Sequence, residues 1–167
     1  MKFIKIFLAS SVVEFKKERL ELKAFINSLN NICVKKGVFF EMKICEELSS
    51  ALAMERKQNE YNEYIRGCDY LFLLFGRSIG KYTIEEFDVA LEHFKAKGTP
   101  KIFVYFKQPA EELLDIEASE TDFMARLEGE PQVCCSRVIH MSDMKRELLE
   151  ILSADKRVDM ILAPQTI

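Results

Sequence analysis

The chain has 167 residues, of which 49% are hydrophobic and 31% are charged. It contains only six glycines and four prolines, which excludes collagen-like, low-complexity and disordered classes. The length fits one domain that buries roughly 70% of the surface of its unfolded chain. With 24 basic and 27 acidic residues, the formal net charge is -3. A mildly acidic surface argues against a nucleic-acid partner, because dedicated nucleic-acid binders usually carry a basic excess.

The cysteines and histidines offer little for a disulfide or metal site. There are five cysteines, an odd number at irregular spacings without a C-x-x-C pair, and two histidines. We therefore expect no disulfide framework, no bound metal and a reduced, cytoplasmic protein whose thiols pack as small apolar residues. The adjacent pair Cys134 and Cys135 is expected to be buried or partly buried.

The first ten residues look briefly like a secretory signal peptide. Lys5 interrupts them, however, and Glu14, Lys16 and Lys17 arrive before an apolar region of the necessary length has formed. Residues 3–9 are better explained as a buried strand. No apolar stretch approaches the ~20 residues of a membrane span, so no membrane partner is expected.

A helix and a second strand follow. Ser11, with Glu14 three residues later, has the form of a capping box. Behind it, apolar residues at helical spacing predict a helix with one buried face; they are Phe15, Leu22, Phe25, Ile26 and Leu29. Residues 38–45 alternate between apolar and charged side chains, which predicts a strand near the edge of a sheet.

The middle of the chain predicts a helix, a central strand and another helix. Residues 61–68 carry apolar side chains at i, i+3, i+4 and i+7, a stripe typical of a helix packed on a core. Residues 69–75 form the most apolar run, which suits a parallel strand covered on both faces. Thr83 and Glu86 have the form of a second capping box, and the helix behind them is expected to stop at Gly98.

The last third continues the alternation. We expect strands at residues 101–106 and 137–141, helix plus loop at 109–128, and a helix at 142–153. The domain is expected to span residues 1–154. Residues 155–167 are expected to form a tail, either a simple terminus or a linker to a further domain of a longer parent chain.

Five strands separated by helices predict right-handed βαβ units and a three-layer α/β/α fold with a five-stranded parallel sheet. With strand order 2-1-3-4-5, ligands bind beyond the carboxyl ends of the first and third strands. The candidate binding residues there are Ser10, Ser11, Gly76, Arg77 and Tyr82. Backbone N–H groups at the two serines suit a phosphate, and Arg77 suits a phosphate or carboxylate. The alternatives are that Ser11 only caps a helix, that Arg77 is solvated and that Tyr82 is a packed loop aromatic.

Three segments, in this order, carry a resemblance to a known family: KIFLASS at 5–11 with Glu18-Arg19 after it, DYLFLLFGR at 69–77, and YTIEEFDVA at 82–90. Together they resemble a bacterial TIR-like family of flavodoxin-like fold, over residues 2–107. The chain has no tryptophan, whereas TIR domains often carry a Trp-Cys motif ahead of their essential glutamate.

TIR domains of the catalytic kind cleave NAD at the nicotinamide–ribose bond. The resemblance therefore implies an NAD glycohydrolase acting in signalling or bacterial defence, with Glu86 as its catalytic carboxylate. It implies NAD or a related nucleotide as the substrate, no required cofactor, and self-association that completes the site. Nicotinamide leaves as a neutral ring from a pyridinium, so one carboxylate beside an oxocarbenium-like transition state is sufficient.

Other interpretations stay open at this stage. Glu86 also suits a purely structural capping role, and the adjacent Glu85 is expected to be solvated. Glu18 and Arg19 are expected to form a structural charge network. For the whole chain, the alternatives are a nucleoside deoxyribosyltransferase-like enzyme, which also uses a glutamate near a helix start, and a non-enzymatic TIR-type oligomerisation module.

Overall fold

The computed structural model describes residues 1–11, 14–44, 51–76, 79–107 and 118–158; the side chains of residues 51–56 and 118–120 are not part of this description. Strands and helices alternate along the described chain. They are β1 (Lys2–Ser10), α1 (Lys16–Cys33), a short 3-10 turn (Val34–Lys36), β2 (Val38–Ile44), α2 (Ala51–Arg66), β3 (Tyr70–Phe75), α3 (Lys81–Lys97), β4 (Lys101–Lys107), α4 (Ala118–Glu128), β5 (Cys134–Val138) and α5 (Met141–Ser153).

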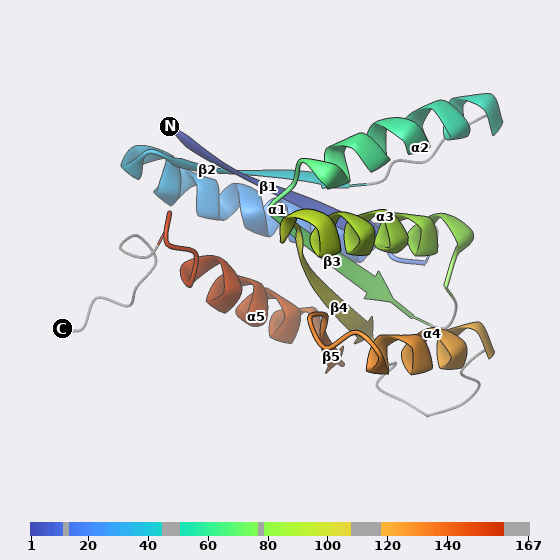
Figure 1. Ribbon diagram of the computed structural model, residues 1–167. Coiled ribbons are helices and arrows are strands. Elements are labelled where there is room, and N and C mark those ends of the chain that lie inside the picture. The colour runs from blue at the N-terminus through green and yellow to red at the C-terminus, as the bar shows by residue number, and fades with distance from the viewer. Residues whose placement is uncertain (12–13, 45–50, 77–78, 108–117, 159–167) are drawn as a thin grey trace.

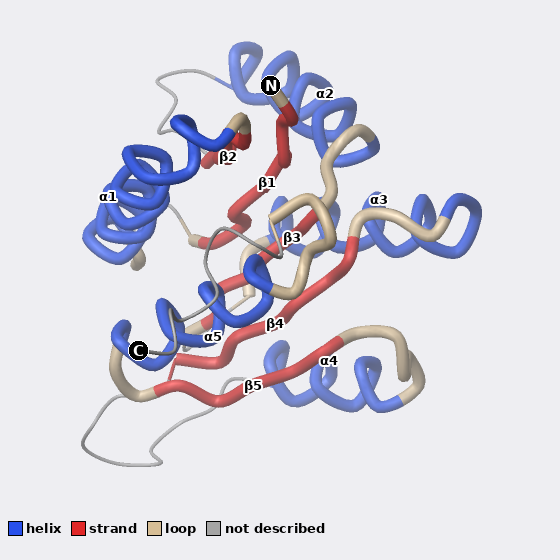
Figure 2. The backbone as a smooth tube through the Cα atoms, turned by 90° about the vertical axis from the view of Figure 1, so that its left-hand side faces the viewer, coloured by secondary structure: helices blue, strands red, loops and turns tan. Residues whose placement is uncertain are grey.

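The five strands form one sheet in the order β2-β1-β3-β4-β5, and each neighbouring pair is parallel. Helices α1 and α5 cover one face, and α2, α3 and α4 cover the other (Figures 1 and 2). This confirms the predicted three-layer α/β/α fold and its strand order. From β1 the chain runs to β2 on one side of it, and then returns to β3 on its other side. The carboxyl ends of β1 and β3 therefore form the switch point, where such sheets bind ligands.

Burial follows strand position. All six residues of β3 are buried, as expected for a central parallel strand covered on both faces. In β2, the side chains of Glu41 and Lys43 keep part of their surface exposed while Val38 and Phe40 are buried. The predicted place of this strand at the edge of the sheet is confirmed.

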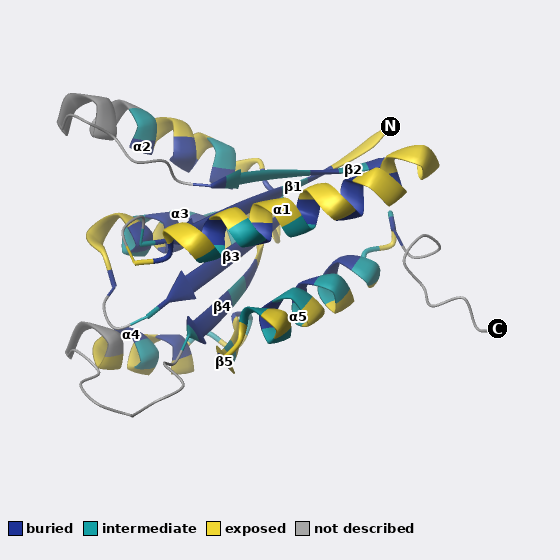
Figure 3. Cartoon of the chain, turned by 180° about the vertical axis from the view of Figure 1, so that it is seen from behind, coloured by how far each residue is buried: buried dark blue, intermediate teal, exposed yellow. Residues whose placement is uncertain are grey.

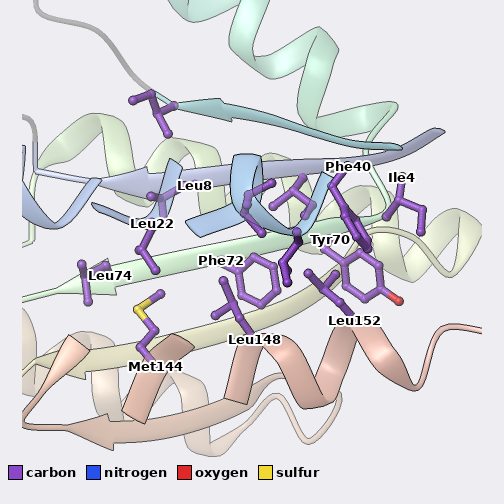
Figure 4. Close-up of a cluster of buried hydrophobic side chains, with 14 of the residues drawn as sticks. Ile4, Leu8, Leu22, Phe40, Tyr70, Phe72, Leu74, Met144, Leu148 and Leu152 are labelled. Carbon is purple, nitrogen blue, oxygen red and sulfur yellow. The ribbon is translucent and has the colours of Figure 1, made fainter. Parts of the chain in front are cut away.

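Two hydrophobic clusters lie on opposite faces of the sheet. Side chains alternate between the faces along each strand. Leu8 of β1 and Leu74 of β3 therefore share one cluster with Leu22 of α1 and Met144 of α5 (Figure 4). The other cluster includes Phe7, Ala9, Leu73 and Phe87 and packs under α2, α3 and α4. In Figure 3 the buried stripes of α1 and α5 face the sheet, while their outer faces are exposed.

Two predicted boundaries are wrong for physical reasons. The last strand covers Cys134–Val138 and not 137–141. Among its five residues only Val138 is buried, so backbone pairing with β4 defines the strand where a hydrophobic pattern does not. Helix α3 begins at Lys81, because Gly80 takes the N-cap position in an extended conformation. Thr83 is thus inside the helix, and the predicted second capping box does not exist.

The predicted burial of the thiols is confirmed for Cys33 and Cys68 and wrong for the pair Cys134 and Cys135. Cys33 and Cys68 are buried and unpaired, whereas Cys134 and Cys135 are exposed on the edge strand β5. Cys45 lies outside the described residues. Within the described ranges, no helix has the length and apolar content needed to cross a membrane. The same ranges hold no cluster of three or more side chains suited to a metal ion.

The packed part of the chain continues past α5. Val158 is 1% exposed and belongs to the cluster beneath α1 and α5. The hydroxyl of Tyr70 donates a hydrogen bond to Oδ2 of Asp155 at 2.7 Å. Arg157 forms an ion pair with Asp69 at 2.8 Å, and Asp69 in turn accepts the N–H of Lys5 at 2.8 Å. These contacts join residues from three distant parts of the sequence at the amino edge of the sheet.

Candidate functional site

The predicted site residues gather at the carboxyl edge of the sheet, but the sheet divides them. Ser10 is the last residue of β1 and is 3% exposed. It has the same parity along the strand as Leu8, so its side chain lies on the α1 side. Among the described residues, its hydroxyl has no hydrogen-bond partner. Glu86, by contrast, lies on α3, which covers the opposite face of the sheet (Figure 2).

The hydroxyl of Ser11 belongs to a local turn. Its Oγ accepts the backbone N–H of Glu14 at 3.3 Å, and its carbonyl accepts the N–H of Phe15 at 3.1 Å. This is one half of the predicted first capping box. Helix α1 nevertheless begins only at Lys16, with Phe15 in the N-cap position and no side-chain cap. The turn formed by Ser11 therefore precedes the helix.

Gly76, the residue after β3, permits a close approach of Glu14 and Phe15, which precede α1. A Cβ at this position would overlap the carboxylate of Glu14 and the buried ring of Phe15. Glu14 and Phe15 thus pack directly on the backbone of Gly76. A side chain at position 76 would push these residues away.

Arg77 lies outside the described residues. Tyr82 is the second residue of α3 and is 41% exposed, so it stands on the helix surface beside the carboxyl edge. An exposed aromatic ring here is available to a ligand at the strand ends, but Figure 1 places its helix on the side of the sheet away from Ser10.

Glu86 is almost completely enclosed. It is the sixth residue of α3 and is 1% exposed. Its neighbours on the buried stripe are Thr83 at 5%, and Phe87 and Ala90 at 0%. Since α3 already has Gly80 as its N-cap, a capping role does not explain the burial of this carboxylate.

Glu85 is not solvated as predicted. Its Oε1 accepts a hydrogen bond from Nδ2 of Asn62 on α2, at 2.8 Å. Asn62 also accepts a bond from Nε2 of Gln58 at 3.1 Å. Both amides are buried, at 9% and 8% exposed. The polar side chains at the α2–α3 interface therefore form a hydrogen-bonded row next to Glu86, which the sequence analysis missed.

Cys68, the buried thiol on the same side of the sheet, is a poor nucleophile. Burial raises its pKa to about 12, and the nearby charge of Asp69 adds to the effect. A thiol with such a pKa is protonated at neutral pH, and only the thiolate attacks. The carboxylate of Glu86 is a second buried reactive group on this side of the sheet.

The structural charge network predicted at the start of α1 is confirmed for Glu18, which forms an ion pair, but not for Arg19. Glu18 pairs with Lys107 at the end of β4, at 3.0 Å, and not with Arg19. Burial works against ionisation of Glu18, but hydrogen bonds from Lys107 and the backbone outweigh it and lower the pKa of the carboxyl. Arg19 is 5% exposed, and its Nε and Nη1 have no partner in the described part of the chain.

Another feature lies at the outer edge of β2. A pocket of about 140 Å³ opens there between α1 and α2, and its lining is rich in lysine and includes Tyr61. Lys43 lies over the rings of Tyr61 and Tyr64, at 5.8 and 4.9 Å from their centroids. The edge position of β2 separates this pocket from the switch point by the width of β1.

Comparison with known proteins gives likenesses among solved structures only. No family model matches the chain, and no curated protein matches it. Among solved structures, the chain is similar to the CMP N-glycosidase BcmB of Clostridium botulinum, with 14% sequence identity and a TM-score of 0.47. The alignment covers 86% of this chain and 97% of that one.

Proposed function

We propose that the chain hydrolyses the N-glycosidic bond of a nucleotide, with NAD as the first candidate substrate and Glu86 as the catalytic carboxylate. The observation that carries the proposal is the burial of Glu86, at 1% exposure, on the helix that follows the central strand. The position matches the essential glutamate of the TIR-like family that the sequence resembles. The proposal rests on this residue and not on the likeness to BcmB.

The chemistry requires little from the protein. The bond between ribose C1′ and the nicotinamide nitrogen breaks, and its electron pair neutralises the pyridinium. The sugar passes through an oxocarbenium-like state, which a carboxylate held in a low-dielectric environment stabilises. Water then adds to C1′ and loses a proton. No general acid is needed, because the leaving group departs as a neutral molecule.

The fixed position of the neighbouring carboxylate supports this role for Glu86. Glu85 is held by Asn62, so it is anchored to α2 and unavailable to a ligand. Adjacent helical residues also point about 100° apart. The two glutamates therefore make a matched pair, in which the same substitution is expected to have very different effects on catalysis.

The test is release of nicotinamide from NAD by concentrated protein, measured by chromatography. High protein concentration matters because the family resemblance implies a site completed by self-association. Glu86→Gln is expected to lower turnover by at least about 100-fold, and Glu85→Gln by only a few-fold. Equal activity in wild type and Glu86→Gln would remove Glu86 from the mechanism.

The same assay separates the other functions. Adding a second free nucleobase and searching for a new nucleoside tests the deoxyribosyltransferase-like alternative. A preparation that folds and self-associates yet releases no base from NAD, from nucleoside monophosphates or from nucleosides would favour the oligomerisation module.

A further inference from the structure

Arg19 is a buried cation with two nitrogens that have no hydrogen-bond partner in the described part of the chain. The residue is 5% exposed, and neither Nε nor Nη1 has a hydrogen-bond partner among the described residues. Glu18, the residue before it in the sequence, forms its ion pair with Lys107 at 3.0 Å. A guanidinium offers five N–H donors in a planar fork and stays protonated in proteins. Leaving it buried and unpaired costs several kcal/mol, so such a group points to an anion that completes it.

The helix places this side chain over the switch point. Along α1, Arg19 lies one turn after Phe15 and one turn before Leu22 on the stripe that faces the sheet. Phe15 packs against Gly76, and Leu22 shares its cluster with Leu8 and Leu74 (Figure 4). Arg19 therefore lies above the carboxyl ends of β1 and β3.

Ser10 supplies a second unpaired group at the same place. It follows Leu8 by two positions, so it extends the α1-facing row of β1 to the strand end. Its residue is 3% exposed and its Oγ has no partner in the described structure. Two neighbouring elements thus each present a buried, unpaired polar side chain at the edge where parallel sheets bind ligands.

The other charged side chains near Arg19 affect how strongly an anion would bind there. Glu18 is neutralised by Lys107. The carboxylate of Glu14 packs against Gly76 and is an acidic group that an incoming anion would meet at this edge. Arg19 keeps 5% of its surface exposed, so it is not sealed off completely.

We infer that Arg19 and Ser10 bind a phosphate group, and that this phosphate belongs to the nucleotide whose N-glycosidic bond is cleaved. Phosphate fits the guanidinium fork with two parallel hydrogen bonds and accepts the serine hydroxyl as a third. The assignment to a substrate rests on the proposed function; the phosphate site itself does not. It deepens the proposed function by naming the two side chains that would recognise the phosphate of the nucleotide.

Binding of inorganic phosphate and pyrophosphate tests the site without any turnover. Calorimetry and thermal unfolding are expected to show binding and a higher Tm for wild type, with binding weakened about tenfold or more in Arg19→Met. Ser10→Ala is expected to bind several-fold more weakly, and Glu14→Gln more tightly. Arg146→Met, on the exposed face of α5, is the matched control and should bind like wild type.

The Tm values of wild type and Arg19→Met without phosphate give a second test, because removing an unpaired buried charge should not lower the Tm. Met fills the space of the aliphatic stem of arginine and carries no charge, so Arg19→Met should keep or raise the Tm in phosphate-free buffer. An arginine held by ordinary structural contacts would instead lower the Tm when replaced. A lower Tm together with phosphate binding equal to wild type would overturn the inference.

Turnover then separates the two proposals. With the substrate that wild type cleaves, Arg19→Met is expected to raise KM by tenfold or more, and Glu86→Gln to lower kcat. Matched nucleotide and nucleoside substrates should differ in wild type and become similar in Arg19→Met. If KM is the same in wild type and Arg19→Met, and the same for nucleotide and nucleoside, the phosphate site is overturned and the proposed function is not. Arg19-dependent phosphate binding without cleavage of any nucleotide overturns the proposed function alone.

Discussion

The side-chain amide of Asn62 donates a hydrogen bond to the carboxylate of Glu85, with 2.8 Å between Nδ2 and Oε1, and so joins α2 to α3. Glu85 precedes the candidate catalytic residue Glu86. Gln58 also donates a hydrogen bond to Asn62. These three polar side chains therefore help to set the position of α3 relative to α2. The position of Glu86 therefore depends on contacts that lie outside its own helix.

Replacing Asn62 is expected to destabilise the protein. Asn62→Leu leaves Gln58 and Glu85 without their partner, which should reduce the free energy of unfolding by about 1–3 kcal/mol. Asn59→Leu, at an exposed position of the same helix, is the control and should change it by less than about 0.5 kcal/mol. Urea unfolding measures both. Similar values for the two variants would show that the row adds no stability.

Asn30 ties α1 to the edge strand β2. Its Nδ2 donates to the carbonyl of Phe40 and its Oδ1 accepts the N–H of the same residue, both at 2.8 Å. Asn30→Ala should cost about 2–4 kcal/mol, because two buried backbone groups lose their partners. The exposed neighbour in Asn31→Ala should cost far less. Hydrogen exchange of the Phe40 amide, accelerated only in Asn30→Ala, would locate the effect.

Gly76→Ala is expected to disturb the loops around the switch point. The new methyl group would overlap Phe15 and Glu14, and overpacking of this kind costs about 1–3 kcal/mol. Gly67→Ala is the control, since a Cβ there comes no closer than 3.6 Å to Tyr64. Thermal unfolding compares the two. An equal Tm would mean that Phe15 moves aside without cost.

Acid should weaken the amino edge through Asp155. Hydrogen bonds from Arg157 hold the pKa of this carboxyl well below its usual value, and Tyr70 adds a further bond, although burial opposes them. A pKa lowered by folding contributes stability above the unfolded value, about 3.9, and this contribution is lost as the pH falls below it. Wild type should thus lose about 1–2 kcal/mol more than Asp155→Asn between pH 6 and 3. Urea unfolding across this range measures the difference, and parallel curves would contradict it.

The hydrophobic pattern was sufficient to predict most of the fold. Four of the five strands were predictable from hydropathy: apolar runs such as 69–75 indicate strands buried on both faces, and the alternation at 38–45 indicates the edge strand β2. The fifth strand was misplaced because β5 is an edge strand with a single buried side chain, Val138. Backbone pairing leaves no trace in hydropathy, so the sequence could not mark where it begins.

The site was less predictable because its contacts are tertiary. The bond from Asn62 to Glu85 joins residues 23 positions apart on different helices, and no local spacing marks it. Arg19 did leave a signal. It occupies a position on the sheet-facing stripe of α1 between Phe15 and Leu22, where an apolar residue is expected. The role of Glu86 stays a prediction, although Gly80 at the N-cap of α3 removes the capping explanation.

The contacts among Lys5, Asp69, Tyr70, Asp155 and Arg157 also bear on how the protein is made. They join residues 64 and 85 positions apart, so the amino edge closes only when both ends of the sequence are present. During synthesis, the first strand leaves the ribosome long before the turn that holds its neighbour. The domain is thus expected to reach its native state only after the segment through Arg157 has emerged.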